Sequence, residues 1–154
     1  MKAEYINPVV VSTLTTLKSM LSIEAQCGKL HLKRDNTTHS ELTSVIGLSG
    51  KVRGSIVMAF NNDVATALVK KFLGIDGDIS QSDLTDGIGE LCNIVGGSAK
   101  VELNKMGLSL SISIPNVICG KGLQIMSNAA YPTFCIPFIT PLGEFLVEIS
   151  LTDA

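Results

Sequence analysis

The chain has 154 residues, of which 45% are hydrophobic and 17% charged, and its formal net charge is -2. This composition fits one folded domain over residues 1–154 and excludes a disordered chain. Basic residues are scattered, with Lys33 and Arg34 as the densest cluster, so the charge pattern does not favour nucleic-acid binding. No apolar stretch approaches 18 residues in length and no secretion leader is evident. We therefore expect a cytoplasmic protein that does not enter a membrane.

The chain begins with a predicted amphipathic helix. Asn7 and Pro8 suit its first turn, and Gly28 is a plausible end. Leucines and valines recur at helical spacing in between, at Val10, Leu14, Leu17 and Leu21. Residues 30–43 are mostly polar and predict a weak strand followed by a loop.

A hairpin and a second helix are predicted next. The apolar runs 45–48 and 55–60 are separated by Gly50 and Gly54, which indicates two paired strands. Asn61, Asn62 or Asp63 can then cap a helix that Gly74 would end.

The second half predicts a long helix and a series of strands. The helix would run over residues 83–104, capped by Ser82 or Asp83 and closed by Gly107. Residues 108–114 alternate strictly between apolar and polar, as a half-buried strand does. Further strand candidates are 117–119, 122–126, 133–139 and 145–151, with turn signals such as Asn128 between them. Short connections imply antiparallel pairing, so we expect an α+β fold with helices packed on one face of an antiparallel sheet.

The four cysteines are Cys27, Cys92, Cys119 and Cys135. None belongs to a C-x-x-C pair, so neither a zinc ribbon nor a thioredoxin-like motif is supported. Their apolar neighbours predict buried, reduced thiols.

Metal sites are not predicted either. His31 and His39 lie in a polar stretch without further ligands nearby in the sequence. Asp76 and Asp78 belong to an acidic stretch, but the glycine and glutamate that a calcium-binding EF-hand loop needs do not follow.

The long helix carries two distinct stripes when it is placed on a helical wheel. The apolar stripe would face the core: Leu84, Ile88, Leu91, Val95 and Ala99, with Cys92 and Leu103 beside it. The other stripe would meet solvent or a partner: Asp86, Glu90, Asn93, Gly97 and Lys100. Glu90 and Asn93 are three residues apart, so their side chains point the same way.

Three glycines inside this helix need an explanation, because each costs about 1 kcal/mol relative to alanine. They are Gly89, Gly96 and Gly97. One interpretation is that they leave the Asn93 amide accessible to another macromolecule. The other is that they permit close packing and that Glu90 and Asn93 are ordinary solvated residues.

The chemistry available to the pair is limited. The sequence shows no nucleophile with a matching base and no phosphate-binding G-x-x-x-x-G-K-[ST] loop. A neutral amide can orient a water molecule for attack on phosphorus, and a carboxylate one turn away can bind a cation. A partner would have to bring the phosphoryl group and the metal.

Residues 86–100 (DGIGELCNIVGGSAK) resemble the E-x-x-N helix of the CheC/CheX/FliY family of chemotaxis proteins, most nearly its CheX type. The resemblance extends over nearly the whole chain through the segments 4–8, 46–50, 53–55, 120–122 and 136–138. One departure is Cys92, which stands where alanine is common in the family.

The resemblance implies a phosphatase that hydrolyses the aspartyl phosphate of a CheY-type response regulator. Asn93 would position the attacking water and Glu90 would bind the regulator's active-site lysine. The neighbouring residues expected to contact the partner are Asp86, Gly89, Gly97 and Lys100. Mg²⁺ would belong to the regulator, so no cofactor of the chain's own is expected.

The resemblance also bears on stoichiometry. Some relatives carry two E-x-x-N helices, but here Glu24 is followed at that spacing by Cys27, so one site per chain is expected. A homodimer formed through the sheets is implied. The alternative function is a non-catalytic module that binds phosphorylated regulators or a flagellar-switch-like assembly.

Overall fold

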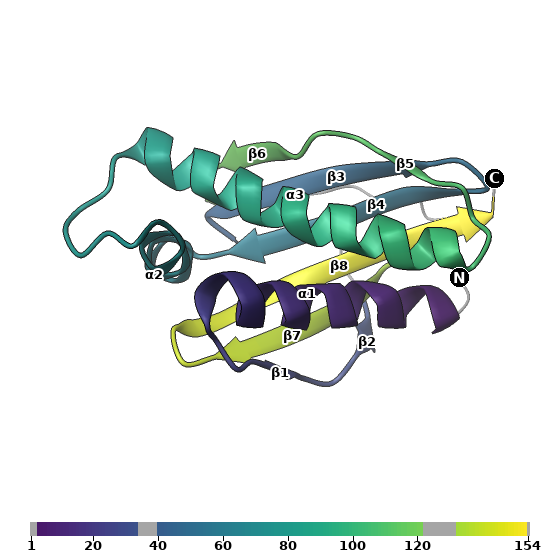
Figure 1. Ribbon diagram of the computed structural model, residues 1–154, viewed down its shortest axis with the longest axis horizontal. Helices are drawn as coiled ribbons and strands as arrows, with labels where there is room; N and C mark the ends of the chain where they lie inside the picture. Colours follow the sequence, from purple (N-terminus) through teal and green to yellow (C-terminus); the bar gives the residue numbers. More distant parts are fainter. Residues whose placement is uncertain (1–2, 34–39, 122–131, 154) are drawn as a thin grey trace.

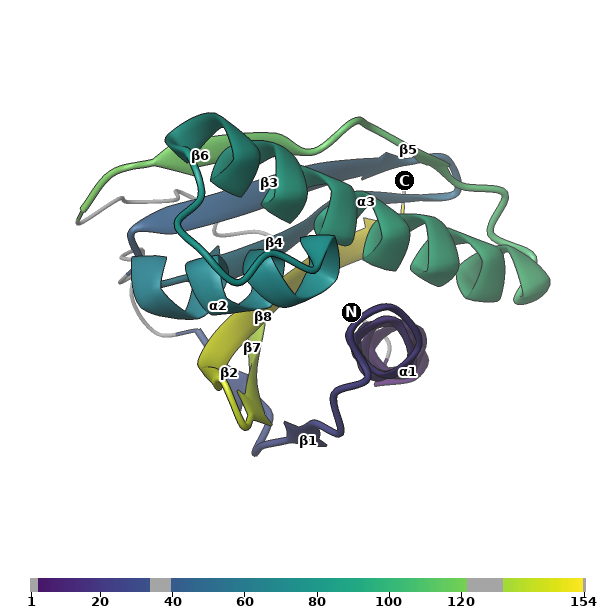
Figure 2. The same cartoon turned by 60° about the vertical axis from the view of Figure 1, so that its left-hand side comes forward.

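A computed structural model of the chain describes residues 3–33, 40–121 and 132–153. Within them, an antiparallel sheet is covered on one face by three α-helices, seen from two directions (Figure 1 and Figure 2). This confirms the expected α+β class. The elements in chain order are a 3₁₀ turn at Ala3–Tyr5, α1 Ile6–Leu21, β1 Gln26–Cys27, β2 His31–Leu32, β3 Leu42–Ser49, β4 Val52–Phe60, α2 Asn62–Leu73, α3 Gln81–Lys105, β5 Ser111–Ile112, β6 Asn116–Cys119, β7 Phe134–Thr140 and β8 Gly143–Asp153.

The sheet has the strand order β1-β7-β8-β4-β3-β5, with β2 also paired to β7 and β6 to β3. The expected hairpin is β3–β4, in which Leu48 lies opposite Gly54 and Gly50 takes a φ of +138° in the turn. The central strands alternate so that residues such as Ile46, Ile56 and Val147 are buried in the core under the helices.

The outer edge of β3 is paired in two separate pieces. β6 pairs with residues 42–45 of β3, whereas β5 pairs only with Leu48 and Ser49. The predicted strand over residues 108–114 is therefore wrong except at Ser111 and Ile112. The strand does not begin at Leu108 because Ser109 takes a left-handed φ of 48°, which interrupts extended backbone.

The predicted bounds of the first helix are wrong at both ends. α1 begins at Ile6, so Asn7 lies inside it and does not cap it. It ends at Leu21 because Ser22 takes a left-handed φ of 54° and its N–H bonds back into the last turn. Gly28 instead pairs with the sheet, where its N–H donates to the Pro137 carbonyl over 2.7 Å.

The second and third helices follow the sequence more closely. The Asn61 side chain accepts the Val64 N–H at the start of α2, and Gly74 ends that helix with a φ of +68°. α3 starts two residues earlier than predicted because Ser80, rather than Ser82 or Asp83, caps it by accepting the Asp83 N–H.

The cysteines divide into two classes. Cys92 and Cys135 are buried as predicted, but Cys27 and Cys119 are exposed, so the prediction is wrong for those two. The apolar neighbours were misleading because β1 and β6 lie near the margins of the sheet, where both side chains reach solvent. None of the four forms a disulfide. Burial raises the pKa of Cys92 to about 12, which keeps it protonated at physiological pH.

The predicted strand over residues 122–126, the turn at Asn128 and the side chain of His39 lie outside the described residues. Among the described helices, none combines the length and the hydropathy needed to cross a membrane.

The glycines of α3 differ in what surrounds them. A Cβ added at Gly87 would lie 2.5 Å from Val69 Cγ1, and one at Gly96 would lie 2.8 Å from Ile46 Cδ1. At Gly97 a Cβ would meet nothing within 4 Å. Gly87 and Gly96 therefore allow close packing of α3 on α2 and on β3, but Gly97 has no such packing role.

This division predicts opposite effects of two alanine substitutions. Gly87→Ala should lower the free energy of unfolding by about 1–2 kcal/mol, because the β-branched Val69 cannot easily move aside. Gly97→Ala should raise it by up to about 1 kcal/mol, since alanine favours the helix and has room there. Urea denaturation of both variants measures the difference. Equal stability of the two would contradict the packing role of Gly87.

Candidate functional site

Glu90 and Asn93 project from the exposed face of α3. The five residues of the predicted core stripe and the two beside it are all buried: Leu84, Ile88, Leu91, Val95 and Ala99, with Cys92 and Leu103. On the other stripe Asp86, Glu90 and Asn93 are exposed, whereas Gly97 and Lys100 are partly buried. The helical wheel therefore placed the two faces correctly, and burial of one face fixes the direction of the other.

A groove of about 430 Å³ lies along this exposed face. One wall is helical and includes the predicted pair, and the other comes from the connection between β5 and β6 and from β6 itself. The lining residues are Thr85, Asp86, Gly89, Glu90, Asn93, Ile114, Pro115 and Val117. The sequence therefore indicated the helical wall but not the second wall. Only tertiary packing places the second wall beside α3.

The second wall is fixed by hydrogen bonds to the sheet. Ser113 N–H donates to the Gly47 carbonyl over 2.9 Å, and the Gly47 N–H donates to Ser113 Oγ over 2.8 Å. These bonds fall in the stretch of β3 between its pairing with β6 and its pairing with β5. Pro115, which ends the alternating pattern of residues 108–114, was the sequence signal for this irregularity.

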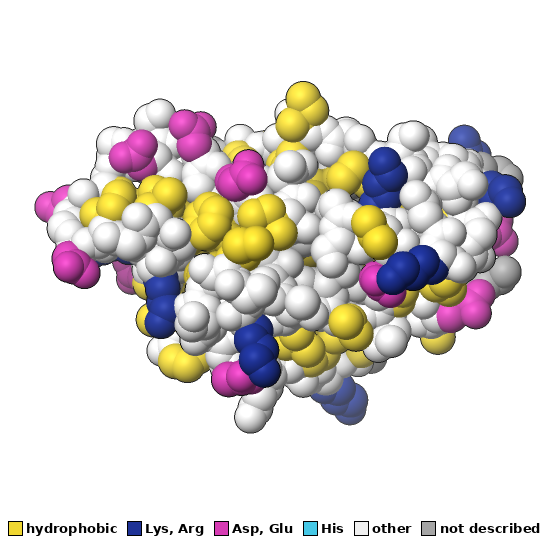
Figure 3. All heavy atoms as spheres, viewed as in Figure 1, with side chains coloured by type: hydrophobic (Ala, Val, Ile, Leu, Met, Phe, Trp, Pro, Cys, Tyr) yellow, Lys and Arg dark blue, Asp and Glu magenta, His cyan; other side chains and the backbone are white. Residues whose placement is uncertain are grey.

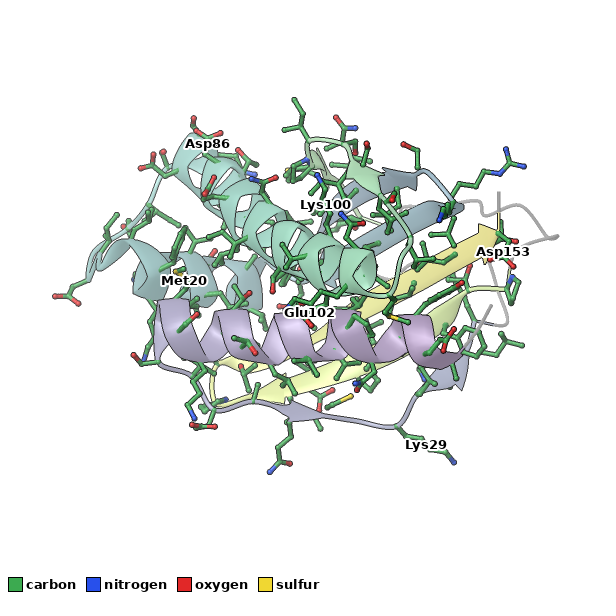
Figure 4. The ribbon with its side chains drawn as sticks, turned by 45° about the vertical axis from the view of Figure 1, so that its right-hand side comes forward. Met20, Lys29, Asp86, Lys100, Glu102 and Asp153 are labelled. Carbon is green, nitrogen blue, oxygen red and sulfur yellow. The ribbon has the colours of Figure 1, made fainter. Side chains whose placement is uncertain are left out.

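The predicted partner-contacting residues separate into two groups. Asp86 and Gly89 line the groove with Glu90 and Asn93, but Gly97 and Lys100 do not line it. Asp86 lies near the beginning of α3 and Lys100 towards its end, both on the side of α3 away from α1 (Figure 4). The structure thus puts all of them on one face of the helix, with Gly97 and Lys100 beyond the groove.

The groove is polar and acidic along its helical wall. Acidic side chains gather over the first half of α3 (Figure 3). Among the described residues, the carboxylates of Asp86 and Glu90 have no ion-pair partner, and the Asn93 amide has no hydrogen bond. The Thr85 hydroxyl, by contrast, donates to the backbone carbonyls of Gln81 and Ser82, at 3.1 Å each. The polar groups available to a ligand are therefore one amide and two carboxylates.

These groups do not make a complete catalytic site. No cluster of three or more histidine, cysteine or acidic side chains suited to a metal ion occurs in the described part of the chain. No nucleophile with a base beside it lines the groove. An amide that can hold a water and a carboxylate that can hold a cation are suited to completing a site that another molecule supplies.

Sequence and structure comparisons identify similar proteins. A sequence model of the family described as "Chemotaxis phosphatase CheX" matches residues 42–139. The curated protein "CheY-P phosphatase CheX" of Thermotoga maritima is 30% identical over 129 residues, which make up 82% of this chain and 83% of that protein.

Solved structures share the fold over almost the whole chain. The crystal structure of the chemotaxis protein CheX from Desulfovibrio desulfuricans is 33% identical, with a TM-score of 0.88 over 98% of this chain and 99% of that one. A CheX–CheY–BeF3–Mg²⁺ complex from Borrelia burgdorferi contains a chain that is 24% identical, with a TM-score of 0.81 over 99% of this chain and 100% of that one. At this identity the second likeness is evidence for the fold alone.

Proposed function

This chain belongs to the chemotaxis phosphatase CheX family, and on that premise we propose that it hydrolyses the aspartyl phosphate of a CheY-type response regulator. The observation that carries the proposal is the exposed Glu90 and Asn93 pair, which has no partner among the described residues and lines an open groove. The Thermotoga maritima relative, at 30% identity, is a CheY-P phosphatase by name.

In the proposed mechanism Glu90 and Asn93 have different roles. Asn93 enters the regulator's active site, where its amide holds a water in line with the aspartyl phosphate. The water attacks phosphorus, the bond from phosphorus to the aspartyl oxygen breaks, and inorganic phosphate leaves. Positioning of this kind is a large part of catalysis in phosphoryl transfer.

Glu90 acts in docking. Its carboxylate lies one helical turn from Asn93 and accepts a charge-assisted hydrogen bond from the regulator's active-site lysine. Asp86 and Gly89 contact the regulator within the groove, and Gly97 and Lys100 contact it farther along α3. The partner brings Mg²⁺, in keeping with the metal and the BeF3 named in the Borrelia burgdorferi complex. The described residues of this chain gather no metal ligands of their own.

The same proposal covers the setting of the protein. Residues 1–154 act as a single domain in the cytoplasm, because phosphorylated regulators are found there. Two copies pair through their sheets as a homodimer, with one site in each copy.

Asn93→Ala should reduce the acceleration of dephosphorylation about a hundredfold or more, because a water-positioning group is lost. The measurement is the decay of a phosphorylated CheY-type receiver with and without the protein. Asn93 is exposed, so the thermal unfolding midpoint should not change. Full activity of Asn93→Ala would refute the role of the amide. Binding by the unmodified protein without acceleration would instead support the non-catalytic binding module.

Glu90→Gln should weaken binding of the phosphorylated receiver about tenfold, because one charged contact is lost while the shape is kept. Its affinity should also fall less steeply with salt than that of the unmodified protein. Glu102→Gln is the matched control, since it removes another α3 carboxylate, one paired with Lys105 outside the groove. Equal affinities and salt dependences for Glu90→Gln and Glu102→Gln would exclude the docking role.

The proposed dimer is tested by analytical ultracentrifugation. At micromolar concentrations the chain should sediment at twice its mass of 16.3 kDa. A single species at the monomer mass over that range would argue against the dimer, and would leave the phosphatase proposal unaffected.

A further inference from the structure

Ile114 is a large hydrophobic side chain held in solvent at the edge of the groove. It is 83% exposed, which exceeds the exposure of every other large hydrophobic residue in the described part of the chain. Hydrophobic atoms project over the β5–β6 connection, close to the acidic atoms on the first half of α3 (Figure 3). Single exposed apolar residues are common on protein surfaces, so exposure alone does not assign a role.

The backbone around Ile114 is held firmly in place. Both hydrogen bonds between Ser113 and Gly47 tie the preceding residue to β3, and Ser113 Oγ donates to the Ile114 carbonyl over 3.2 Å. The next residue, Pro115, has a fixed φ. The side chain is therefore presented to solvent by an ordered backbone, and little conformational entropy would be lost if a partner covered it.

The location of Ile114 connects it with the polar pair. Ile114, Pro115 and Val117 form an apolar wall of the groove, opposite the helical wall that carries Asp86, Glu90 and Asn93. A ligand of this groove must meet carboxylates and an amide on one side and aliphatic carbon on the other. The two unpaired carboxylates favour a cationic group, and the apolar wall favours a partner with hydrophobic surface beside that cation.

We propose that Ile114 is a docking residue, which the receiver domain of the phosphorylated regulator covers with apolar surface next to its phosphorylation site. This inference rests on the proposed function, because it takes the occupant of the groove to be that receiver. Ile114 adds to the affinity and selectivity of the complex beside Glu90, which binds the active-site lysine, whereas Asn93 acts at the phosphorylated residue. An exposed aliphatic side chain that a partner covers contributes binding energy by leaving water.

The test separates binding from chemistry. Ile114→Ala should raise the Kd for the receiver about tenfold, the loss expected when aliphatic carbon is removed from a covered contact. The rate at saturating receiver should stay within about twofold of the unmodified protein, because the side chain does not position the water. Ile114→Leu should restore the affinity, since it keeps the apolar volume. The receiver used is the CheY-type receiver that the unmodified protein dephosphorylates, loaded with BeF3 and Mg²⁺ for the binding measurement.

Val101→Ala is the matched control. Val101 is another aliphatic residue, 53% exposed on α3, and does not line the groove. Both side chains are exposed, so neither alanine variant should alter thermal unfolding by more than a degree or two.

The outcomes distinguish the docking role of Ile114 from the phosphatase function on which it rests. If Ile114→Ala binds as tightly as Val101→Ala, or loses its saturated rate with an unchanged Kd, the docking role is overturned while the phosphatase proposal stands. If the unmodified protein neither binds nor dephosphorylates any CheY-type receiver, both fail together.

Discussion

Burial of one face of α3 is the constraint on which the site depends. Its aliphatic residues are packed against the sheet and the other helices, and each large one contributes about 2 kcal/mol by leaving water. The four glycines of the same helix would cost it about 4 kcal/mol in isolation. Packing therefore outweighs poor helix propensity. Because the core face cannot rotate, Glu90 and Asn93 have a fixed direction, and a rigid element carries the functional groups.

The glycines show how packing and access are combined in one helix. From the sequence, close packing and an open approach were both possible explanations. The structure supports each at different positions: Gly87 and Gly96 sit against Val69 and Ile46, whereas the space beside Gly97 is empty. The glycines that allow close packing lie on the buried side and Gly97 lies on the face that carries Asn93. One residue type thus serves two physical purposes within a few turns.

The sequence was informative where structure is decided locally. The hairpin, the caps of α2 and the two faces of α3 follow from turn residues and periodicity within short windows. Errors arose where distant parts of the chain decide. Serine is not a residue type that predicts a left-handed φ, yet Ser22 ends the first helix early and Ser109 interrupts the predicted strand near its start. Likewise, the exposure of Cys27 and Cys119 depends on where β1 and β6 lie in the sheet.

Only one wall of the candidate site could be predicted from local sequence patterns. Its helical wall is a pattern of three- and four-residue steps, so the wheel and the family resemblance both lead to Glu90 and Asn93. The opposite wall lies more than twenty residues later in the chain and reaches the groove only because β5 and β6 share the edge of β3. Hydrophobic periodicity cannot predict that this wall lies beside α3. It indicates which side of a segment is buried, but not which other segments are its neighbours. Ile114 in particular belongs to the apolar set of the predicted alternating strand, yet it lies beyond the end of β5 and is 83% exposed.

The incompleteness of the groove has a consequence for selectivity. A neutral amide cannot attack phosphorus, and two carboxylates without further ligands would repel a phosphate rather than bind it. The groove therefore gives no favourable site to a free phosphoester. Activity on an aspartyl phosphate requires a partner whose own cations neutralise the phosphoryl oxygens and offset the negative charge of Asp86 and Glu90. Under the proposed function, the protein discriminates among phosphorylated molecules because it depends on the partner's cations. Only a partner surface that places positive charges at the right distance from the Asn93 amide completes the reaction centre.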